Sequence, residues 1–194
     1  MANKINTVDN IFESSSKIIL DSKKLSVPIT KSVDLISKAI RKGNKIILFG
    51  NGGSAADAQH MAAEFVGRFM KERKSFPAIS LSTDSSIITA LGNDYTFERI
   101  FSRQAESLVN KGDIVIAIST SGRSKNVLEG IKTSKKLGAK IVSLSGKNGG
   151  KMKLNSDILL NVPSTTTSRI QEAHRTIIHI ICELTENELT KKKS

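Results

Sequence analysis

The sequence predicts an α/β fold: a doubly wound, mainly parallel five-stranded sheet with helices on both faces. Five short, β-branched, continuously apolar runs alternate with helix-forming segments, which is typical of parallel strands buried on both faces. Two of these runs end in glycine-rich or hydroxyl-rich turns that lead directly into helices. Because no internal repeat or low-complexity linker divides the chain, we expect residues 1–194 to form a single domain.

Two helices are expected before the first strand, and they span residues 4–43 with a helical apolar stripe. We expect Pro28 to separate them and Gly43 to end the second. Because the chain is polar and poor in aromatic residues, we expect residues 1–43 to bury surface against other subunits. The strands are expected at 45–49, 78–81, 113–118, 140–144 and 157–162. The later helices are expected at 54–70, 85–92, 96–109, 124–137, 149–154 and, as a long closing helix, 168–190.

The composition excludes several classes of protein. The formal net charge is +12, but the lysines are scattered and no aromatic residues alternate with them, so we expect no specific nucleic acid binding. A solvated basic surface, for solubility alone or for attracting acidic metabolites, accounts for the charge. No apolar run approaches the ~20 residues that cross a bilayer, and the N-terminus lacks the order of a signal peptide. We therefore expect a cytoplasmic protein with no membrane segment, and Cys182 as a buried structural thiol.

The first informative turn lies in the stretch IILFGNGGSAADAQHMAAE, residues 46–64. An apolar run ends in Gly50-Asn51-Gly52-Gly53-Ser54 at the start of a helix, where backbone N–H groups can bind an anion. His60 and Glu64 are four residues apart and share one helix face. They could transfer protons or bind a metal, although an ordinary surface pair would have the same spacing.

The second turn, Ser119-Thr120-Ser121-Gly122-Arg123-Ser124, also follows an apolar run and precedes a helix. Its hydroxyl and N–H groups suit a phosphate, although a cluster of helix caps has the same composition. Ligands of open α/β sheets bind outside the carboxyl ends of the strands, so the two turns are expected to converge. Neither turn matches a dinucleotide or P-loop motif, so we expect no nucleotide cofactor.

The closing helix contains Gln171 and His179, about 80° apart around its axis at 100° per residue. Both can face one cleft, with His174 and Arg175 on the flanks, although a histidine among isoleucines is often a core residue. Imidazole, carboxylate and amide groups together could also form a zinc site. Asn93 and Asp94 are, from the sequence alone, only part of a turn.

Five motifs carry a resemblance to a known family: GNGGSAADAQHMAAEF, TALGND, GDIVIAISTSGRSKNV, SLSGKNGGKM and RIQEAHRTIIHIIC. In their order and separations they resemble the phosphoheptose isomerases of the sugar isomerase (SIS) superfamily, from about residue 40 onward. The resemblance implies a homotetramer with active sites between subunits. It also implies conversion of sedoheptulose 7-phosphate to D-glycero-D-manno-heptose 7-phosphate. This is the first step toward the ADP- or GDP-heptose used for lipopolysaccharide or capsule.

The resemblance further implies roles for individual residues. Glu64 and His179 would be the acid/base pair, and one zinc per subunit would be bound by His60, Glu64, Gln171 and His179. The implied substrate contacts are Asn51, Gly52, Gly53, Ser54, Glu64, Asn93, Asp94, Ser119, Thr120, Ser121, Ser124 and Gln171. Arg123 departs from the family, whose turn usually has a small polar residue there, and we expect its side chain to point outward from the turn.

The residue types agree with this chemistry. Moving a proton between adjacent carbons through an enediol needs one group for the carbon-bound proton and another for the oxygen, roles that a carboxylate and an imidazole can divide. The alternative is a non-catalytic SIS-domain protein that binds a replication initiator or senses a sugar phosphate. The presence of both Glu64 and His179 favours the enzyme.

Overall fold

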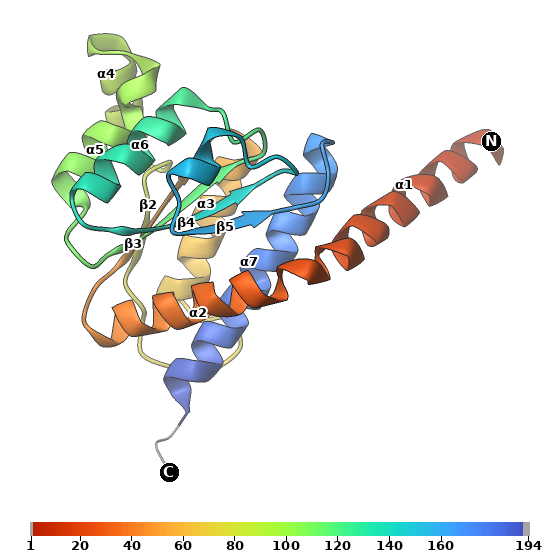
Figure 1. Ribbon diagram of the computed structural model, residues 1–194, viewed down its shortest axis with the longest axis horizontal. Helices are drawn as coiled ribbons and strands as arrows, with labels where there is room; N and C mark the ends of the chain where they lie inside the picture. The colour runs from red at the N-terminus through yellow and green to blue at the C-terminus, as the bar shows by residue number, and fades with distance from the viewer. Residues whose placement is uncertain (1, 192–194) are drawn as a thin grey trace.

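Five short strands form one parallel sheet in the order β2-β1-β3-β4-β5 in the computed structural model, which describes residues 2–191 (Figure 1). All four strand pairs are parallel, which confirms the predicted fold class. The strands are β1 Ile46–Gly50, β2 Ala78–Ser80, β3 Ile114–Ser119, β4 Lys140–Ser145 and β5 Ile158–Asn161.

The helices alternate with the strands as expected. They are α1 Ala2–Asp21, α2 Ser26–Arg41, α3 Gly53–Val66, α4 Ser85–Asp94, α5 Ile100–Leu108, α6 Lys125–Lys136 and α7 Thr167–Thr190. Three short 3₁₀ helices are η1 Ser22–Leu25, η2 Phe97–Arg99 and η3 Gly150–Leu154.

Each face of the sheet has its own apolar core, because neighbouring residues of a strand point to opposite faces. In β1, Ile46 and Leu48 pack with α2, α3 and α7, whereas Ile47 and Phe49 pack with α5 and α6. All five residues of β1 are buried. This burial on both faces is the physical reason for the continuous apolar runs in the sequence.

Three local expectations need correction. The break between the first two helices is η1, before Pro28, which lies in the first turn of α2, where a missing N–H costs no helical hydrogen bond. The third helix ends at Val66 rather than residue 70, and Gly67 donates a C-terminal hydrogen bond to Ala63 O. Asn93 and Asp94 are the last two residues of α4, not part of a free turn.

The order of the strands places the two informative turns together. β1 and β3 are neighbours, but β1 is followed along the chain by α3 on one face and β3 by α6 on the other. In this topology the chain turns to opposite faces at the β1/β3 pair and leaves a crevice at its carboxyl edge. The turns after β1 and β3 border this crevice.

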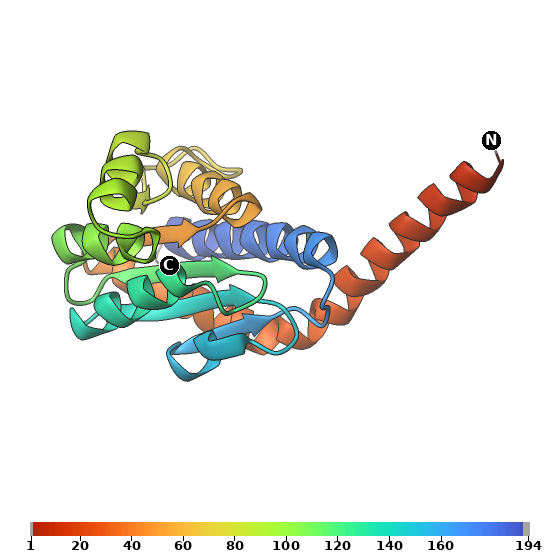
Figure 2. The same cartoon turned by 90° about the horizontal axis from the view of Figure 1, so that it is seen from above.

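The helix α1 extends away from the sheet and its covering helices (Figure 2). Its attachment to α7 includes hydrogen bonds from Ser15 Oγ to Glu172 Oε2 (2.7 Å) and from Arg169 Nη1 to Ile11 O (2.7 Å). Several of its apolar side chains remain exposed: Ile5, Val8, Ile11, Phe12 and Leu20. Within residues 2–191, none of the helices combines the length and apolarity that crossing a bilayer requires.

Candidate functional site

The glycine turn after β1 is shaped by its glycines. Gly52 precedes α3 with φ +54°, a backbone conformation that side-chain-bearing residues rarely adopt. A Cβ atom on Gly53 would collide with the side-chain amide of Gln171. The turn therefore brings the N-terminus of α3 against the start of α7.

The hydroxyl turn after β3 gathers three serine side chains. Ser119 Oγ lies 3.1 Å from Ser124 Oγ and 3.5 Å from Ser121 Oγ. The glycine turn is joined to the start of α6 by a reciprocal pair of amides, with Asn51 Nδ2 2.9 Å from Asn126 Oδ1 and Asn126 Nδ2 2.8 Å from Asn51 Oδ1. Asn126 lies 75 residues from Asn51, so the sequence analysis did not identify it.

An imidazole and carboxylate cluster lies between α3 and α7. His60 Nε2 is 2.9 Å from His179 Nε2 and 3.4 Å from Glu64 Oε1. One imidazole must donate and the other accept, because both contacting atoms are Nε2. Burial, and next the charge of Arg175, lower the pKa of His60, which favours its neutral form. The structure thus brings Glu64 and His179 together through His60.

A second contact between α3 and α7 lies beside this cluster. Arg175 Nη2 is 2.7 Å from Asp57 Oδ1, and the Asp57 side chain is only 5% exposed. Burial raises the pKa of Asp57, and the neighbouring guanidinium opposes that shift. One face of α7 carries Gln171, Arg175 and His179 on successive turns of the helix. This face meets the α3 face that carries Asp57 and His60.

The remaining predicted residues lie elsewhere. Asn93 Nδ2 donates to Asp94 Oδ1 (2.9 Å) at the exposed end of α4, which packs against α5, and among residues 2–191 no hydrogen bond joins either residue to the two turns. His174 is fully buried, with Nε2 3.2 Å from Ser145 O, and burial lowers its pKa to about 4. Cys182 is buried, and burial raises the pKa of its thiol. His174 and Cys182 are therefore core residues.

The loop after α3 also contributes to the site. Its Phe69 ring lies 5.7 Å from the His179 ring, centroid to centroid. The carboxylate of Glu186 on α7 accepts hydrogen bonds from the backbone N–H groups of residues 69, 70 and 71 and from Arg73 Nε. Sequence reasoning missed this set of hydrogen bonds between Glu186 and the loop after α3, because Glu186 and Arg73 are 113 residues apart.

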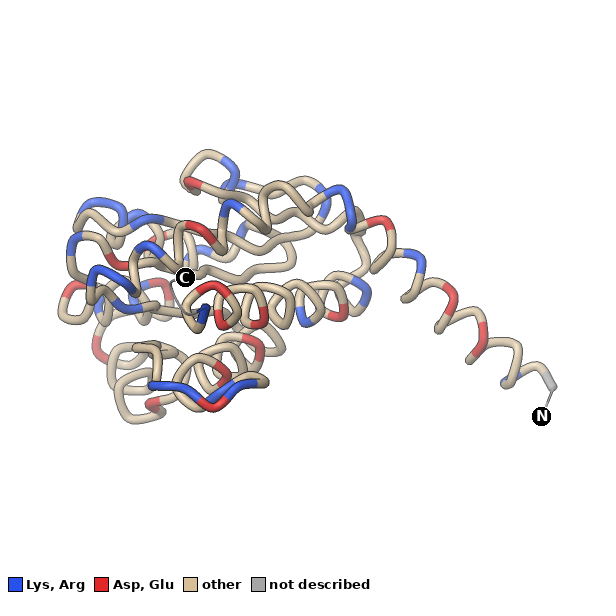
Figure 3. Tube along the Cα trace, turned by 90° about the horizontal axis from the view of Figure 1, so that it is seen from below, with Lys and Arg blue, Asp and Glu red and all other residues tan. Residues whose placement is uncertain are grey.

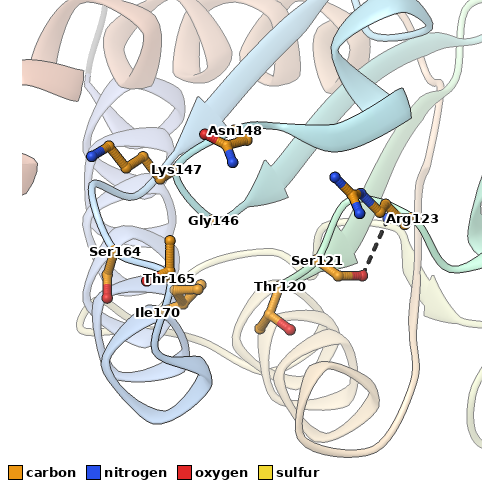
Figure 4. A pocket seen from close by; sticks show the side chains of 9 residues that line it. All are labelled: Thr120, Ser121, Arg123, Gly146, Lys147, Asn148, Ser164, Thr165 and Ile170. Atoms are coloured by element: carbon orange, nitrogen blue, oxygen red, sulfur yellow. Dashed lines mark hydrogen bonds between the residues drawn. The ribbon is translucent and has the colours of Figure 1, made fainter.

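A pocket of about 300 Å³ lies on the other side of the hydroxyl turn, toward β4 and β5 (Figure 4). Arg123 is one of the residues that line this pocket, and the expectation that its side chain points outward from the turn stays a prediction. The Arg123 backbone N–H donates to Ser121 Oγ (3.2 Å) at the edge of the pocket. The lining residues are Thr120, Ser121, Arg123, Gly146, Lys147, Asn148, Ser164, Thr165 and Ile170.

The donor types at the imidazole cluster fit zinc, which accepts imidazole nitrogen and carboxylate oxygen ligands. Two imidazole nitrogens and one carboxylate oxygen converge there, from His60, His179 and Glu64. In the described part of the chain, no group of three or more His, Cys, Asp or Glu side chains has a spacing that could hold a metal. Gln171 contacts Gly53, two turns of α7 away from His179. The zinc site therefore stays a prediction.

Comparisons with known proteins agree with this geometry. A family model described as the SIS domain matches residues 12–146. The chain is 52% identical to a phosphoheptose isomerase of Aquifex aeolicus over 180 residues, which covers 92% of this chain and 94% of that protein. Among solved structures, it is similar to phosphoheptose isomerases from Neisseria gonorrhoeae (TM-score 0.89, 39% identity, 94% and 98% of the chains covered) and Francisella tularensis (0.91, 33%, 95% and 98%).

Proposed function

The chain belongs to the phosphoheptose isomerases, a family of SIS-domain enzymes, and we propose that it interconverts sedoheptulose 7-phosphate and D-glycero-D-manno-heptose 7-phosphate. It is an isomerase, and the non-catalytic alternatives are not favoured. The observation that supports the chemistry best is the convergence of Glu64 and His179 on His60 between α3 and α7.

The proposed mechanism divides the proton transfers of an enediol reaction between two groups. A carboxylate such as Glu64 can accept and return the carbon-bound proton, and the His179 imidazole can exchange the proton of the neighbouring oxygen. The contact between His60 and His179 orients the second imidazole, because each ring fixes the tautomer of the other. The Phe69 ring lies beside the His179 ring, with 5.7 Å between the ring centroids.

The phosphate of the substrate would bind at the two turns. Ser119, Ser121 and Ser124 present hydroxyl groups that can donate to phosphate oxygens, at the N-terminal end of α6. The glycine turn, residues 50–54, forms the opposite wall, and the Asn51–Asn126 pair holds the two walls at a fixed separation. Sugar hydroxyl contacts are proposed for Asn93 and Asp94, which would require their approach from a neighbouring subunit or a movement of α4.

We also propose that the enzyme is a cytoplasmic homotetramer that supplies heptose for lipopolysaccharide or capsule. The exposed apolar side chains of α1 support the assembly, because Phe12 is 69% and Ile5 56% exposed on a helix that leaves the body of the subunit. The positive surface charge supports attraction of an anionic substrate, since Lys and Arg recur along most of the chain (Figure 3).

The zinc ion is proposed to be bound by His60, Glu64, Gln171 and His179, one ion per subunit. When bound, it would polarise the substrate carbonyl and stabilise the developing oxyanion. We expect protein purified without chelators to contain close to one zinc per subunit by elemental analysis. A protein free of metal that retains full activity would contradict a role for the ion.

The direct test of the proposed function is turnover. Purified protein should convert sedoheptulose 7-phosphate to the aldose phosphate, detected by chromatography or by a coupled assay. Sedoheptulose without the phosphate serves as the matched control and should be converted far more slowly, because it lacks the group that binds at the turns. No conversion of the phosphate ester by correctly folded protein would contradict the proposal.

A double substitution tests the hydroxyl turn. We expect Ser119→Ala with Ser121→Ala to raise the KM for the sugar phosphate about 10- to 100-fold and to change kcat by less than about threefold. Each lost hydrogen bond to a charged group is worth about 1.5–3 kcal/mol, but water partly replaces it. Steady-state kinetics measure both constants. An unchanged KM would show that these hydroxyls do not bind the substrate.

A further inference from the structure

Ser145 and Gly146, at the carboxyl end of β4, connect the hydroxyl turn to the rest of the molecule. Ser145 is paired in the sheet with Ser119, the first residue of that turn. The Gly146 N–H donates to Thr120 O in the turn (2.9 Å), and the Val162 N–H, directly after β5, donates to Ser145 O (2.9 Å). Both residues belong to the motif SLSGKNGGKM, which has no role in the proposed mechanism.

The helix α7 reaches the same junction through His174. This side chain is fully buried, and its Nε2 lies 3.2 Å from Ser145 O. Because a carbonyl oxygen can only accept, Nε2 carries the hydrogen and Nδ1 is bare in the neutral ring. Among residues 2–191, Nδ1 has no hydrogen-bond partner. The bond to Ser145 O is therefore the polar contact that directs the ring within the described chain.

A purely apolar side chain would fill this space with a smaller loss of stability. A buried nitrogen without a partner is destabilising, because it gives up its bond to water and gains none. Burial also lowers the pKa of His174 to about 4, so the ring is neutral and forms no ion pair near neutral pH. What an apolar residue could not do is donate to Ser145 O. This bond is the feature that distinguishes the histidine from the isoleucines around it.

The surroundings of Gly146 leave the junction little room to move. A Cβ atom there would lie 2.6 Å from Ile170 Cδ1, 2.7 Å from Thr120 O and 3.1 Å from Ser164 O. Figure 4 shows Gly146 between Ser164 and the residues of the hydroxyl turn. Ile170 and His174 are one turn apart on α7. The helix thus contacts the end of β4 at two successive turns, once by packing and once by a hydrogen bond.

We propose that His174 is a positioning residue, which ties the end of β4 to α7 and through it holds the hydroxyl turn in place. The chain of bonds runs from His174 Nε2–H to Ser145 O, and from the adjacent Gly146 N–H to Thr120 O. A turn that is held before the substrate arrives loses less conformational freedom on binding, so its affinity is higher. The effect on substrate binding rests on the proposed function, whereas the tie between α7 and the turn does not.

Two amide substitutions separate this hydrogen bond from the burial of a polar side chain. In His174→Gln the amide nitrogen can reach the position of Nε2, whereas in His174→Asn the shorter side chain places it near Nδ1. By hydrogen exchange without ligand, we expect residues 119–124 and 145–148 to exchange at least about fivefold faster in His174→Asn than in wild type. In His174→Gln they should stay within about twofold of wild type. Residues 46–50, in β1, report opening of the whole sheet.

Ile181→Ala is the matched control for a general loss of core packing. Ile181 is fully buried on the same helix, about two turns beyond His174. We expect it to lower stability without a selective increase in exchange at residues 119–124. If it shows the same selective increase as His174→Asn, or if His174→Asn and His174→Gln exchange alike, the tie through His174 is refuted.

A measurement on the wild type decides the case if His174→Asn does not fold. The chain has three histidines, so their ¹⁵N imidazole resonances can be assigned one by one. At about pH 6 the His174 ring should be neutral and protonated at Nε2. A ring protonated at Nδ1 alone could not donate to Ser145 O and would refute the proposal whatever the variants show.

Kinetics with sedoheptulose 7-phosphate test the consequence for the substrate. We expect His174→Asn to raise KM about 5- to 20-fold with kcat within about threefold of wild type, because the turn is loosened and the acid/base groups are not touched. His174→Gln and Ile181→Ala should keep KM within about twofold. Faster exchange in His174→Asn with an unchanged KM would refute the role in substrate binding. Absence of turnover in wild type would contradict the proposed function, and hydrogen exchange would still decide whether His174 holds the turn.

Discussion

Glu64→Gln should lower kcat about 1000-fold and leave the affinity for the sugar phosphate within about threefold of wild type. General acid–base groups contribute about 10²–10⁴ in rate, and an amide of the same shape cannot accept the proton. Glu64 is partly exposed beside His60, and its side chain makes no buried ion pair, so the substitution should not unfold the protein. Single-turnover kinetics and equilibrium binding of the substrate separate the chemical step from binding.

Glu183→Gln is the matched control for this substitution. Glu183 is an exposed residue of α7, one turn beyond His179, and undergoes the same chemical change without a contact in the imidazole cluster. We expect its kcat to stay within twofold of wild type. If Glu64→Gln retained full activity, Glu64 would not be the base. If it lost binding and folded structure as well as activity, its role would be structural.

The sheet could be predicted because its physical cause is local in the sequence. Each central strand is buried on both faces, so residues 46–49 and 114–118 are apolar without interruption. The two turns could be predicted because glycines and hydroxyl residues directly follow these runs. The parallel order then brings both turns to one edge of the sheet.

Contacts between distant residues could not be predicted in this way. The Asn51–Asn126 pair depends on the exact placement of the glycine turn against the start of α6, and nothing in the sequence marks Asn126 as the partner of Asn51. The pocket beside Arg123 depends on the loop after β4, which forms its other wall. Likewise, the break at η1 precedes Pro28 because proline is tolerated in the first turn of a helix.

Pairing between His60 and His179 illustrates the same limit at the candidate site. Helical spacing predicts that His60 and Glu64 share a face and that Gln171 and His179 lie within about 80° of each other. The spacing does not predict that His179 meets His60 while Gln171 meets Gly53, two turns away. That arrangement follows from the side-by-side packing of α3 and α7.

The second large effect is expected for stability, at Glu186. This carboxylate is 2% exposed and binds three backbone N–H groups and the guanidinium of Arg73, which is itself 4% exposed at its side chain. Arg73 also donates to the carbonyl oxygens of Glu64 and Phe65 at the end of α3. Glu186→Ala therefore leaves a buried cation and several N–H groups without partners, so we expect the free energy of unfolding to fall by about 3–5 kcal/mol.

Glu188→Ala provides the matched control on the same helix. Glu188 pairs with Arg41 at 2.9 Å, but both side chains are partly solvated, at 30% and 50% exposure. An exposed pair is worth about 0–1 kcal/mol, so this variant should unfold close to wild type. Urea unfolding at equal protein concentration measures both variants, since assembly makes stability depend on concentration. Equal stabilities of the two variants would contradict a stabilising role for the hydrogen bonds of Glu186.

The pH dependence of the stability of Glu186→Gln separates the contribution of the Glu186 charge from that of the side chain's shape. Burial raises the pKa of Glu186, but the hydrogen bonds from Met70, Phe69, Lys71 and Arg73 together lower it by more. The net pKa therefore lies below the ordinary value of 4.5. A carboxyl with a lowered pKa stabilises the fold fully above its unfolded pKa, and this stabilisation is lost as the pH falls through the folded pKa. Wild type should therefore exceed Glu186→Gln in stability at pH 7, and the difference should shrink below about pH 4.5. If the stability difference between wild type and Glu186→Gln is the same at about pH 3 as at pH 7, it does not come from the charge of the Glu186 carboxylate. The loop would then be held by the shape and packing of the side chain.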